Sequence, residues 1–296
     1  MKPILKWAGG KRQLKKHLLK YIKSKDLENS SYFEPFFGGG YLFFNLSPKR
    51  SFINDINKEI INVYLCIKKN PIKLINLLKI HEKFNSEDYF YNIRNLDRSS
   101  NSSIKRLTNI EKAARTIYLN KTCYNGLFRV NSKGQFNVPY GKYKKPKILD
   151  KENIFQLSDF LNKEHVEITS LDFSIAVRNA KKGDFIYFDP PYDYDNHEGF
   201  VNYNKDGFDR KDLIRLKETC DVLIEKGCIV LLSNNDTSFV RNLFLDNNHE
   251  NFYSIESLIA NRSINSNSNF RKNAKEVLIY GRNKKPKKTN AIPSGE

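Results

Sequence analysis

Residues 183–192 read GDFIYFDPPY, and this stretch is the strongest guide to the fold. Its apolar run, Phe185 to Phe188, is typical of a strand that is buried on both faces of a sheet. Two consecutive prolines, Pro190 and Pro191, hold the turn after the strand rigid. Open α/β sheets bind ligands at the carboxyl ends of their strands. The stretch therefore predicts a turn that faces a ligand at such an edge.

Further strand signals lie on both sides of this stretch. We expect strands in FEPFFGGG (33–40), SFIND (51–55), HVEITSLDF (165–173, with Asp172 at the strand's end), GCIVLLSNND (227–236) and KEVLIYG (275–281). Helical patterns separate them, and a helix after the strand in residues 227–236 can be capped by Asn235, Asp236 or Thr237. Strands that alternate with helices predict the α/β class with a Rossmann-like sheet.

A helical segment and a hairpin interrupt this sheet pattern. Helical periodicity runs from about residue 58 to 122, and Thr108 or Asn109 can cap the helix that starts near residue 110. The turn residues Asn131-Ser132-Lys133-Gly134 lie between two aromatic-rich runs, which predicts a β-hairpin. We therefore expect a sheet domain in residues 1–57 and 150–283, an inserted domain in 58–149 and a flexible basic tail in 284–296.

The charge of the chain favours a polyanionic partner. The 296 residues include 51 Lys and Arg against 33 Asp and Glu, a formal net charge of +18. An AT-rich source genome, which inflates Lys, Asn and Ile, would explain the same charge.

The 4 cysteines and 5 histidines show no metal-ligand spacing. The first residues are too short and polar for a signal peptide, and no apolar run is long enough to span a membrane, so we expect a cytoplasmic protein.

The residues DPPY (189–192) suit chemistry on an aromatic amino group. The lone pair of adenine's amino nitrogen is delocalised into the ring, so that nitrogen is a poor nucleophile. A carboxylate (Asp189) and a backbone carbonyl (Pro190) that accept both N–H hydrogens draw it toward a tetrahedral, nucleophilic state. Pro191 restricts the Pro190 carbonyl, and the Tyr192 ring offers a stacking surface for the base. The alternative is an acidic proline turn with a purely structural role.

The glycine-rich segment FFGGG (36–40) has the features of a cofactor loop. Gly38 and Gly40 allow the backbone to approach a ligand closely, and Asp55 at the end of the next strand can accept hydrogen bonds from both ribose hydroxyls. The segment lacks the full phosphate-binding signature, which fits a ligand without phosphates such as S-adenosyl-methionine. A tight turn and a solvated Asp55 remain the alternative. The Gly9-Gly10-Lys11 run does not form a Walker loop, because Leu5 and Arg12 occupy positions that need Gly and Ser or Thr.

The hairpin segment carries side chains that suit DNA. Arg129 can bind guanine, Asn131 and Asn137 can bind adenine, and lysines such as Lys142 suit phosphates. Aromatic residues can fill the gap when a base leaves the stack. An ordinary exposed basic hairpin is the alternative.

Taken together, the motifs resemble the Dam-like DNA adenine methyltransferase family, which includes the GATC-methylating enzymes. They occur in register along nearly the whole chain: LKWAGGK (5–11), FEPFFGGG (33–40), NDIN (54–57), YNGLFRVN with GQFNVPYGKYKKP (124–146), DPPY (189–192), LLSNNDT (231–237) and RSINSNSNFRKNAKEVL (262–278). The resemblance implies a methyltransferase sheet that uses S-adenosyl-methionine, with an inserted DNA-recognition domain. It also implies methylation of adenine N6 in double-stranded DNA, within GATC, after the base has flipped out.

The resemblance assigns roles to individual positions. Those implied to bind the cofactor are Trp7, Lys11, Phe36, Gly38, Gly40, Asp55, Asp172, Phe173 and Asp189. Those implied to act in catalysis are Asp189, Pro190 and Tyr192. Positions implied or inferred to contact DNA are Lys6, Tyr124, Asn125, Leu127, Arg129, Asn131, Asn137, Pro139 and Lys142. Lys142 departs from the family, where Arg is frequent, and we expect it to contact a phosphate because Lys lacks the bidentate fork.

Three rival functions are weighed against this hypothesis. A cytosine-N4 methyltransferase would usually begin the motif with Ser, and a protein-glutamine methyltransferase with Asn, so Asp189 disfavours both. A non-catalytic DNA-binding protein is disfavoured by the intact DPPY and glycine motifs. We expect a monomer without a catalytic metal. The sequence leaves open the exact target, a cognate restriction endonuclease as partner, a solitary or phage role, and any preference for hemimethylated DNA.

Overall fold

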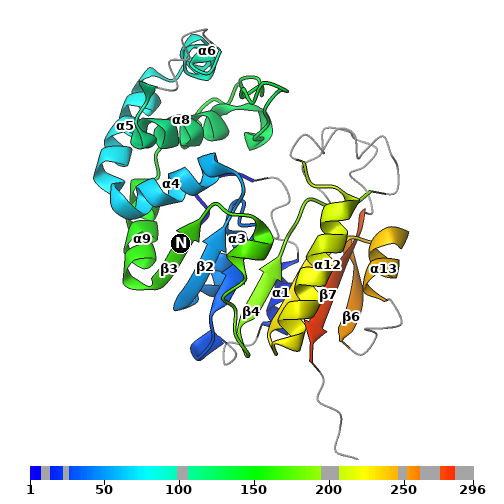
Figure 1. Cartoon of the computed structure of the whole chain (residues 1–296). Coiled ribbons are helices and arrows are strands. Elements are labelled where there is room, and N and C mark those ends of the chain that lie inside the picture. Colours follow the sequence, from blue (N-terminus) through cyan, green and yellow to red (C-terminus); the bar gives the residue numbers. More distant parts are fainter. Residues whose placement is uncertain are drawn as a thin grey trace, which may run out of the picture.

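The strands of the protein form one mostly parallel sheet. The computed structural model describes residues 1–7, 14–22, 27–98, 106–194, 207–245, 252–260 and 274–283. Within these ranges, seven strands pair in the order β3-β2-β1-β4-β5-β7-β6 (Figure 1). They are β1 (Tyr32–Glu34), β2 (Arg50–Asn54), β3 (His165–Thr169), β4 (Phe185–Phe188), β5 (Ile229–Asn235), β6 (Tyr253–Ala260) and β7 (Ala274–Arg282). Neighbours from β3 to β5 are parallel, and β7 is antiparallel to β5 and β6. The predicted α/β class is confirmed.

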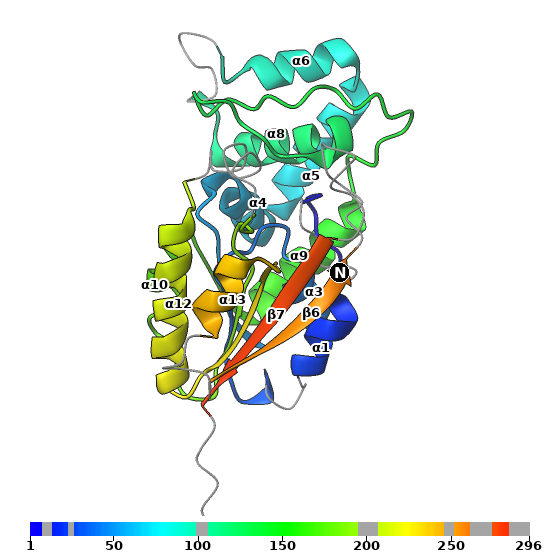
Figure 2. The same cartoon turned by 90° about the vertical axis from the view of Figure 1, so that its right-hand side faces the viewer.

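Helices cover both faces of this sheet, as Figure 2 shows from the side of β6 and β7. One face packs against α10 (Phe173–Ala176), α12 (Arg210–Glu225) and α13 (Ser238–Phe244). The other face packs against α1 (Lys15–Tyr21), α3 (Tyr41–Leu46), α4 (Lys58–Lys69) and α9 (Lys151–Lys163). Strands between two helical layers must be apolar on both sides, which is why the central strands read as continuous apolar runs.

Strand β4 illustrates this two-sided burial. Phe185 and Tyr187 pack into the core on the α4 side, whereas Ile186 and Phe188 pack into the core on the α12 side. All four residues are at most 1% exposed. The prediction of a buried strand before DPPY is confirmed, and this strand fixes where the turn begins.

A second group of elements lies beyond the carboxyl ends of the parallel strands. It contains α5 (Pro71–Phe84), α6 (Glu87–Asn95), α8 (Asn109–Thr122), the short 3-10 helix η1 (Tyr124–Gly126) and the segment after it (Figure 1). Thr108 caps α8 together with Glu111, as predicted. Antiparallel bridges join Cys123 to Tyr140 and Val130 to Phe136, so residues 123–140 form a loose hairpin rather than two regular strands.

The observed strands differ from the predictions in three places: β1 ends at Glu34 rather than at the glycines 38–40, and β3 and β6 also differ. Strand β3 ends at Thr169, so the expectation that Asp172 ends a strand is wrong. Asp172 instead caps α10, because its side chain accepts the backbone N–H of Ser174. Strand β6 was not predicted. Within the described ranges, no helix is both long and apolar enough to cross a membrane.

Candidate functional site

The topology brings the two sharpest sequence motifs to the same end of the sheet, where the carboxyl ends of the parallel strands lie. We call this end the strand-end edge. Strand β1 lies between β2 and β4, and Tyr32 is in register with Ser51 on one side and Phe185 on the other. The loops that follow these three strands are therefore neighbours. The loop after β1 carries the glycine segment 36–40, the loop after β2 carries Asp55, and the loop after β4 carries Asp189. The site predicted from separate stretches of sequence is thus built at a single strand-end edge.

The glycine loop is tightly folded against Asp55 and Trp7. The N–H of Gly38 donates a 2.7 Å hydrogen bond to Oδ2 of Asp55. Gly38 has φ +48°, and a Cβ there would lie 2.7 Å from Cδ1 of Trp7. Gly40 has φ +70°, and its Cβ would lie 2.3 Å from Cζ of Phe37. Both glycines are therefore required by the conformation, and three predicted cofactor positions (Trp7, Gly38 and Asp55) lie together.

Phe36, Asp172 and Phe173 form the next part of the edge. The rings of Phe36 and Phe173 stack with centroids 5.5 Å apart. Asp172 accepts two hydrogen bonds of 3.0 Å from the guanidinium of Arg215 on α12. Partial burial raises the pKa of Asp172, but the hydrogen bonds from Ser174 and Arg215 outweigh it and keep the pKa below its ordinary value. Asp172 is therefore an ionised group beside an aromatic surface.

Asn54 joins the three loops that carry these residues, and it was not singled out from the sequence. Its side chain donates to the carbonyl oxygens of Pro35 and Leu171, both at 3.0 Å. It also accepts from the N–H of Leu171 and the hydroxyl of Thr169, both at 2.8 Å. Asn54 is 2% exposed, so its side chain is buried, and its bond to Pro35 is buried as well. One neutral side chain thus fixes the ends of β1, β2 and β3 relative to one another.

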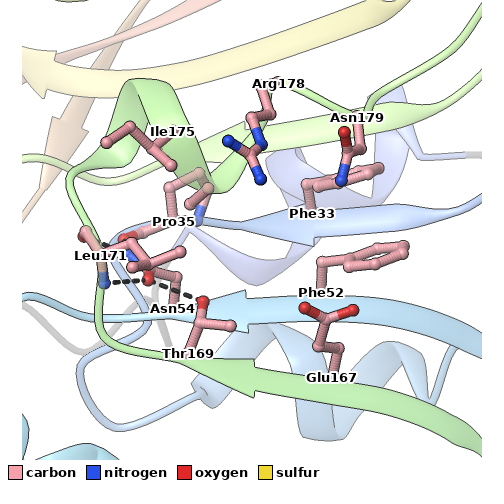
Figure 3. A pocket seen from close by; sticks show the side chains of 11 residues that line it. Phe33, Pro35, Phe52, Asn54, Glu167, Thr169, Leu171, Ile175, Arg178 and Asn179 are labelled. Atoms are coloured by element: carbon pink, nitrogen blue, oxygen red, sulfur yellow. Dashed lines mark hydrogen bonds between the residues drawn. The ribbon is translucent and has the colours of Figure 1, made fainter.

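A hollow lies beside Asn54 on the α10 side of the sheet (Figure 3). The stacked rings of Phe33 and Phe52, 4.5 Å apart, line it, and Glu167 and Arg178 stand on opposite sides. The dashed bonds in Figure 3 show Asn54 held to Leu171 and Thr169 at its rim.

The DPPY turn is held by the strand next to it. The hydroxyl of Ser233 on β5 donates a 2.8 Å hydrogen bond to Oδ1 of Asp189. Ser233 is fully buried, and its oxygen lies 3.0 Å from the hydroxyl of Tyr187. Farther along the turn, the hydroxyl of Tyr192 donates to Glu276 on β7 at 3.2 Å. Asp189 and Tyr192 are both half-buried. Each side chain is therefore oriented by a hydrogen bond from a strand of the sheet and remains partly accessible to a ligand at the carboxyl ends of the strands.

A buried carboxyl group lies beneath this edge. Glu34 is 3% exposed and accepts a 2.8 Å hydrogen bond from the hydroxyl of Tyr32. Burial raises the pKa of Glu34 to about 8, since the hydrogen bond from Tyr32 opposes only part of the shift and the charge of Asp189 adds to it. Near neutral pH, Glu34 is therefore mostly protonated, which avoids a second buried negative charge close to Asp189.

Lys6 lies next to the hairpin, although the two are far apart in sequence. Asn120 on α8 accepts the N–H of Lys6 and donates to its carbonyl oxygen, both at 2.7 Å. The same amide donates to the carbonyl oxygen of Gly126 at 2.9 Å. The Lys6 ammonium lies 4.7 Å from the centroid of the Tyr143 ring. Asn120 was not identified from the sequence, and it is the residue that joins these two segments.

The predicted DNA-contacting positions of the hairpin differ in exposure. Tyr124, Asn125, Arg129, Pro139 and Lys142 are exposed, whereas Leu127, Asn131 and Asn137 are half-buried. Arg129 donates from Nε to the side chain of Asn137 at 2.8 Å. The Asn131 side chain accepts the N–H groups of Lys133 and Gln135 at 3.0 Å, which confirms the predicted turn. Asn131 thus has a structural role in the turn, and its contact with DNA stays a prediction.

Asp97 attaches the hairpin to the helices. Its carboxylate accepts the N–H of Phe136 at 2.9 Å and a guanidinium N–H of Arg115 on α8 at 2.7 Å. Arg98 pairs with Asp97 and donates to the carbonyl oxygen of Phe136. The sequence analysis missed this group because its members come from three separate segments. The position of the hairpin therefore depends on a network of charged hydrogen bonds. Lys11, the tail 284–296 and most of segment 262–278 lie outside the described residues.

Comparisons with known proteins show the family to which this chain belongs. Residues 7–264 match the family model described as D12 class N6 adenine-specific DNA methyltransferase. The chain belongs to this family. The family is defined by methylation of adenine in DNA, so the protein is an adenine-specific DNA methyltransferase, as the motifs implied.

Curated relatives extend over nearly the full chain. The Type II methyltransferase M1.LlaDCHI of Lactococcus lactis is 42% identical over 284 residues, covering 95% of this chain and 96% of the relative. The Type II methyltransferase M.MjaIII of Methanocaldococcus jannaschii is 37% identical, covering 94% and 98%. The DNA adenine methylase of Haemophilus influenzae is 32% identical, covering 96% and 95%. The similarity to adenine methyltransferases therefore extends over the strands of the sheet and over the segments between them.

Proposed function

We propose that this methyltransferase transfers a methyl group from S-adenosyl-methionine to N6 of an adenine flipped out of duplex DNA, within GATC. The hydrogen bond from Ser233 to Asp189 is the observation that carries the proposal. It fixes one carboxylate oxygen at the end of β4, beside the loop formed by Gly38 and Asp55. An oriented carboxylate next to a nucleoside-type loop suits the activation of an amino group.

The residues at the strand ends fit this cofactor. Gly38 and Gly40 provide a backbone cradle that a Cβ would fill. The Asp55 carboxylate accepts the N–H groups of Gly38 and Asn57, and a carboxylate has about four acceptor positions in all, so it can also accept ribose hydroxyls. Ile56, which is 66% exposed, offers an apolar surface to the adenine ring of the cofactor. Ile56 was not identified from the sequence, although its place after Asp55 could have suggested it.

The chemistry requires positioning rather than a covalent enzyme intermediate. When bound, the cofactor supplies a methyl group already activated by the sulfonium sulfur. Asp189 and the carbonyl of Pro190 would accept hydrogen bonds from the two N6–H groups and hold the nitrogen lone pair toward that methyl group. When the new N–C bond forms as the S–C bond breaks, N6 releases one proton, for which the Asp189 carboxylate is the adjacent acceptor before solvent. Flipping the base out of the duplex costs roughly a few kcal/mol. Stacking of the Tyr192 ring on the flipped base offsets part of this cost. Positioning and local electrostatics then provide most of the acceleration.

The remaining elements support a role in target recognition. We assign residues 58–149 to recognition and residues 1–57 and 150–283 to catalysis, with α4 (Lys58–Lys69) as the part of the first range that packs against the sheet. Lys6, Leu127, Arg129 and Pro139 are our readers of the GATC bases on the strength of the resemblance, and the contact of Lys6 with the hairpin supports their acting together. The names of the two Type II relatives support a cognate restriction endonuclease as a partner.

The substitution Asp189→Ala tests the catalytic assignment. We expect methyl transfer from tritiated cofactor to duplex DNA to fall by about a thousandfold or more, because the carboxylate acts on the reacting nitrogen itself. Binding of S-adenosyl-methionine should weaken but remain measurable by calorimetry. Retained turnover in the variant would contradict the role of Asp189.

Sequencing of methylated adenines tests the proposed target separately. DNA from cells that express the protein should carry N6-methyladenine at GATC sites. Methylation of a different sequence would overturn the assignment of the reading residues and leave the catalytic assignment intact.

A further inference from the structure

The segment LLSNNDT (231–237) forms most of β5 and the turn after it, and its contacts explain more than the orientation of Asp189. Three consecutive residues, Ser233, Asn234 and Asn235, lie along the DPPY turn and are at most 7% exposed. Ser233 bonds to Asp189, as described above. Asn234 and Asn235 bond to Asp193, four residues later. Strand β5 therefore holds both ends of the catalytic turn.

Asp193 is the residue at which these contacts converge. Its N–H donates to the Asn234 side chain at 2.9 Å, and its carbonyl oxygen accepts the amide of Asn235. Its carboxylate accepts the Thr237 hydroxyl at 2.7 Å. It also accepts two guanidinium N–H groups of Arg210, at 2.9 and 3.1 Å. The side chain of Asp193 is 0% exposed, whereas its partner Arg210 is 40% exposed, so the carboxylate is buried and the guanidinium is partly accessible.

Arg210 connects this carboxylate to α12. The guanidinium lies 4.6 Å from the centroid of the Phe239 ring and donates to the carbonyl oxygen of Tyr194 at 3.4 Å. Thr237 in turn accepts the N–H of Val240 at the start of α13. A buried carboxylate is strongly destabilising unless it is paired, so the pair with Arg210 restricts Asp193 to one arrangement. Because only Tyr192 separates Asp193 from the two prolines of the motif, that restriction extends to the reacting turn.

We propose that Asp193 is a positioning residue that aligns the DPPY turn for methyl transfer, with Arg210 as its counterion. The proposal rests on the proposed role of Asp189 in catalysis. Asp193 does not contact the base or the methyl group; it fixes the backbone on the far side of Tyr192. A misplacement of about 1 Å in a reacting group can lower a rate by about a hundredfold. A positioning residue of this kind affects the rate of transfer and leaves cofactor binding on the β1–β3 side intact.

The test compares Asp193→Asn with Asp236→Asn. Asp236 is a matched control, since it also forms a two-bond pair with an arginine, Arg241 on α13. Like the contact of Asp193 with Thr237, this pair lies near the start of α13. That pair does not contact the DPPY turn. Single-turnover methylation is measured at saturating DNA and S-adenosyl-methionine, and the cofactor Kd is measured by calorimetry. We expect Asp193→Asn to lower the rate constant by about ten- to a hundredfold and to change Kd by less than about threefold. Asp236→Asn should change neither quantity.

A second variant, Arg210→Lys, keeps the charge but loses the bidentate fork. It should show the same split with a smaller fall in rate, and it tests the proposal even if Asp193→Asn fails to fold. A wild-type rate in Asp193→Asn or, if that variant does not fold, in Arg210→Lys would overturn the proposal. Equal losses of rate and cofactor affinity would also overturn it, because they indicate a general structural role. Activity in Asp189→Ala would instead overturn the proposed function, so the two failures are distinguishable.

Discussion

The two halves of the strand-end edge are held together by different chemistry. On the β3-β2-β1 side, the neutral amide of Asn54 makes four hydrogen bonds, three of them to backbone atoms. On the β4-β5 side, the buried charge of Asp193 is balanced by Arg210 and bonded to Thr237. A neutral connector holds the loops of Asp55 and Asp172 without adding another charge to them. The charged connector restricts the geometry of the turn that carries Asp189, the proposed catalytic residue.

This difference implies that the two halves contribute to separate steps. The β1–β3 side carries most of the predicted cofactor positions, so its disruption should weaken binding. The β4–β5 side carries Asp189 and Tyr192, so its disruption should slow transfer. Substitutions on the two sides should therefore change different quantities, the cofactor Kd on one side and the transfer rate constant on the other.

Asn54→Asp should weaken cofactor binding by about ten- to a hundredfold. The substitution keeps the shape but turns carboxylate oxygens toward the carbonyls of Pro35 and Leu171, and an unsatisfied buried polar group costs about 1–3 kcal/mol. Calorimetric titration with S-adenosyl-methionine measures the change. Thr169→Val is the matched control: it removes one of the four bonds, and its Kd should rise only a few-fold. An unchanged Kd in Asn54→Asp would show that the β1–β3 loops do not need this connector.

Glu34→Gln should make stability less dependent on pH. Because burial raises the pKa of Glu34 to about 8, the folded protein binds a proton that the unfolded chain has released. Between about pH 5 and about pH 8, the wild type should therefore lose up to about 1.4 kcal/mol of unfolding free energy per pH unit through this group, whereas the neutral amide of the variant does not titrate. Urea melts of both proteins across this range measure the difference. A stability gap that stays constant with pH would contradict the buried, protonated state of Glu34.

Arg215→Ala should have the smallest effect. Arg215 pairs with Asp172, but its side chain is 47% exposed, and such exposed pairs contribute about 0–1 kcal/mol. We expect less than about a fivefold change in cofactor Kd and no change in the single-turnover rate. A larger loss of affinity would mean that Arg215 sets the position of Asp172 on the cofactor side.

The sequence predicted the elements that carry the site better than it predicted the contacts between them. Strand β4, strand β5, the glycine loop and the hairpin turn have local signals: apolar runs, Gly38 and Gly40, and Asn131 before Gly134. The partners of Asp189 and Asp193 were missed because Ser233 and Asn234 lie more than 40 residues away in the chain. Hydrogen bonds across that separation depend on strand order, which periodicity does not encode.

The misplaced end of β3 has a similar origin. The apolar and β-branched residues before Thr169 predict a strand, and nothing local marks its end. The side chain of Asn54 accepts the N–H of Leu171 and donates to its carbonyl oxygen, so this residue leaves the strand ladder. Asp172 is then placed to cap α10 instead of ending the strand.

The separation of binding from transfer is tested most directly by measuring both quantities in Asn54→Asp and Asp193→Asn side by side. Cofactor Kd comes from calorimetry, and the transfer rate constant comes from single-turnover methylation at saturating cofactor and DNA. We predict that Asn54→Asp raises Kd at least about tenfold with a near-normal rate constant, and that Asp193→Asn does the reverse. If both variants change the same quantity to the same extent, the two halves of the edge act as one unit, which contradicts the separation of binding from transfer.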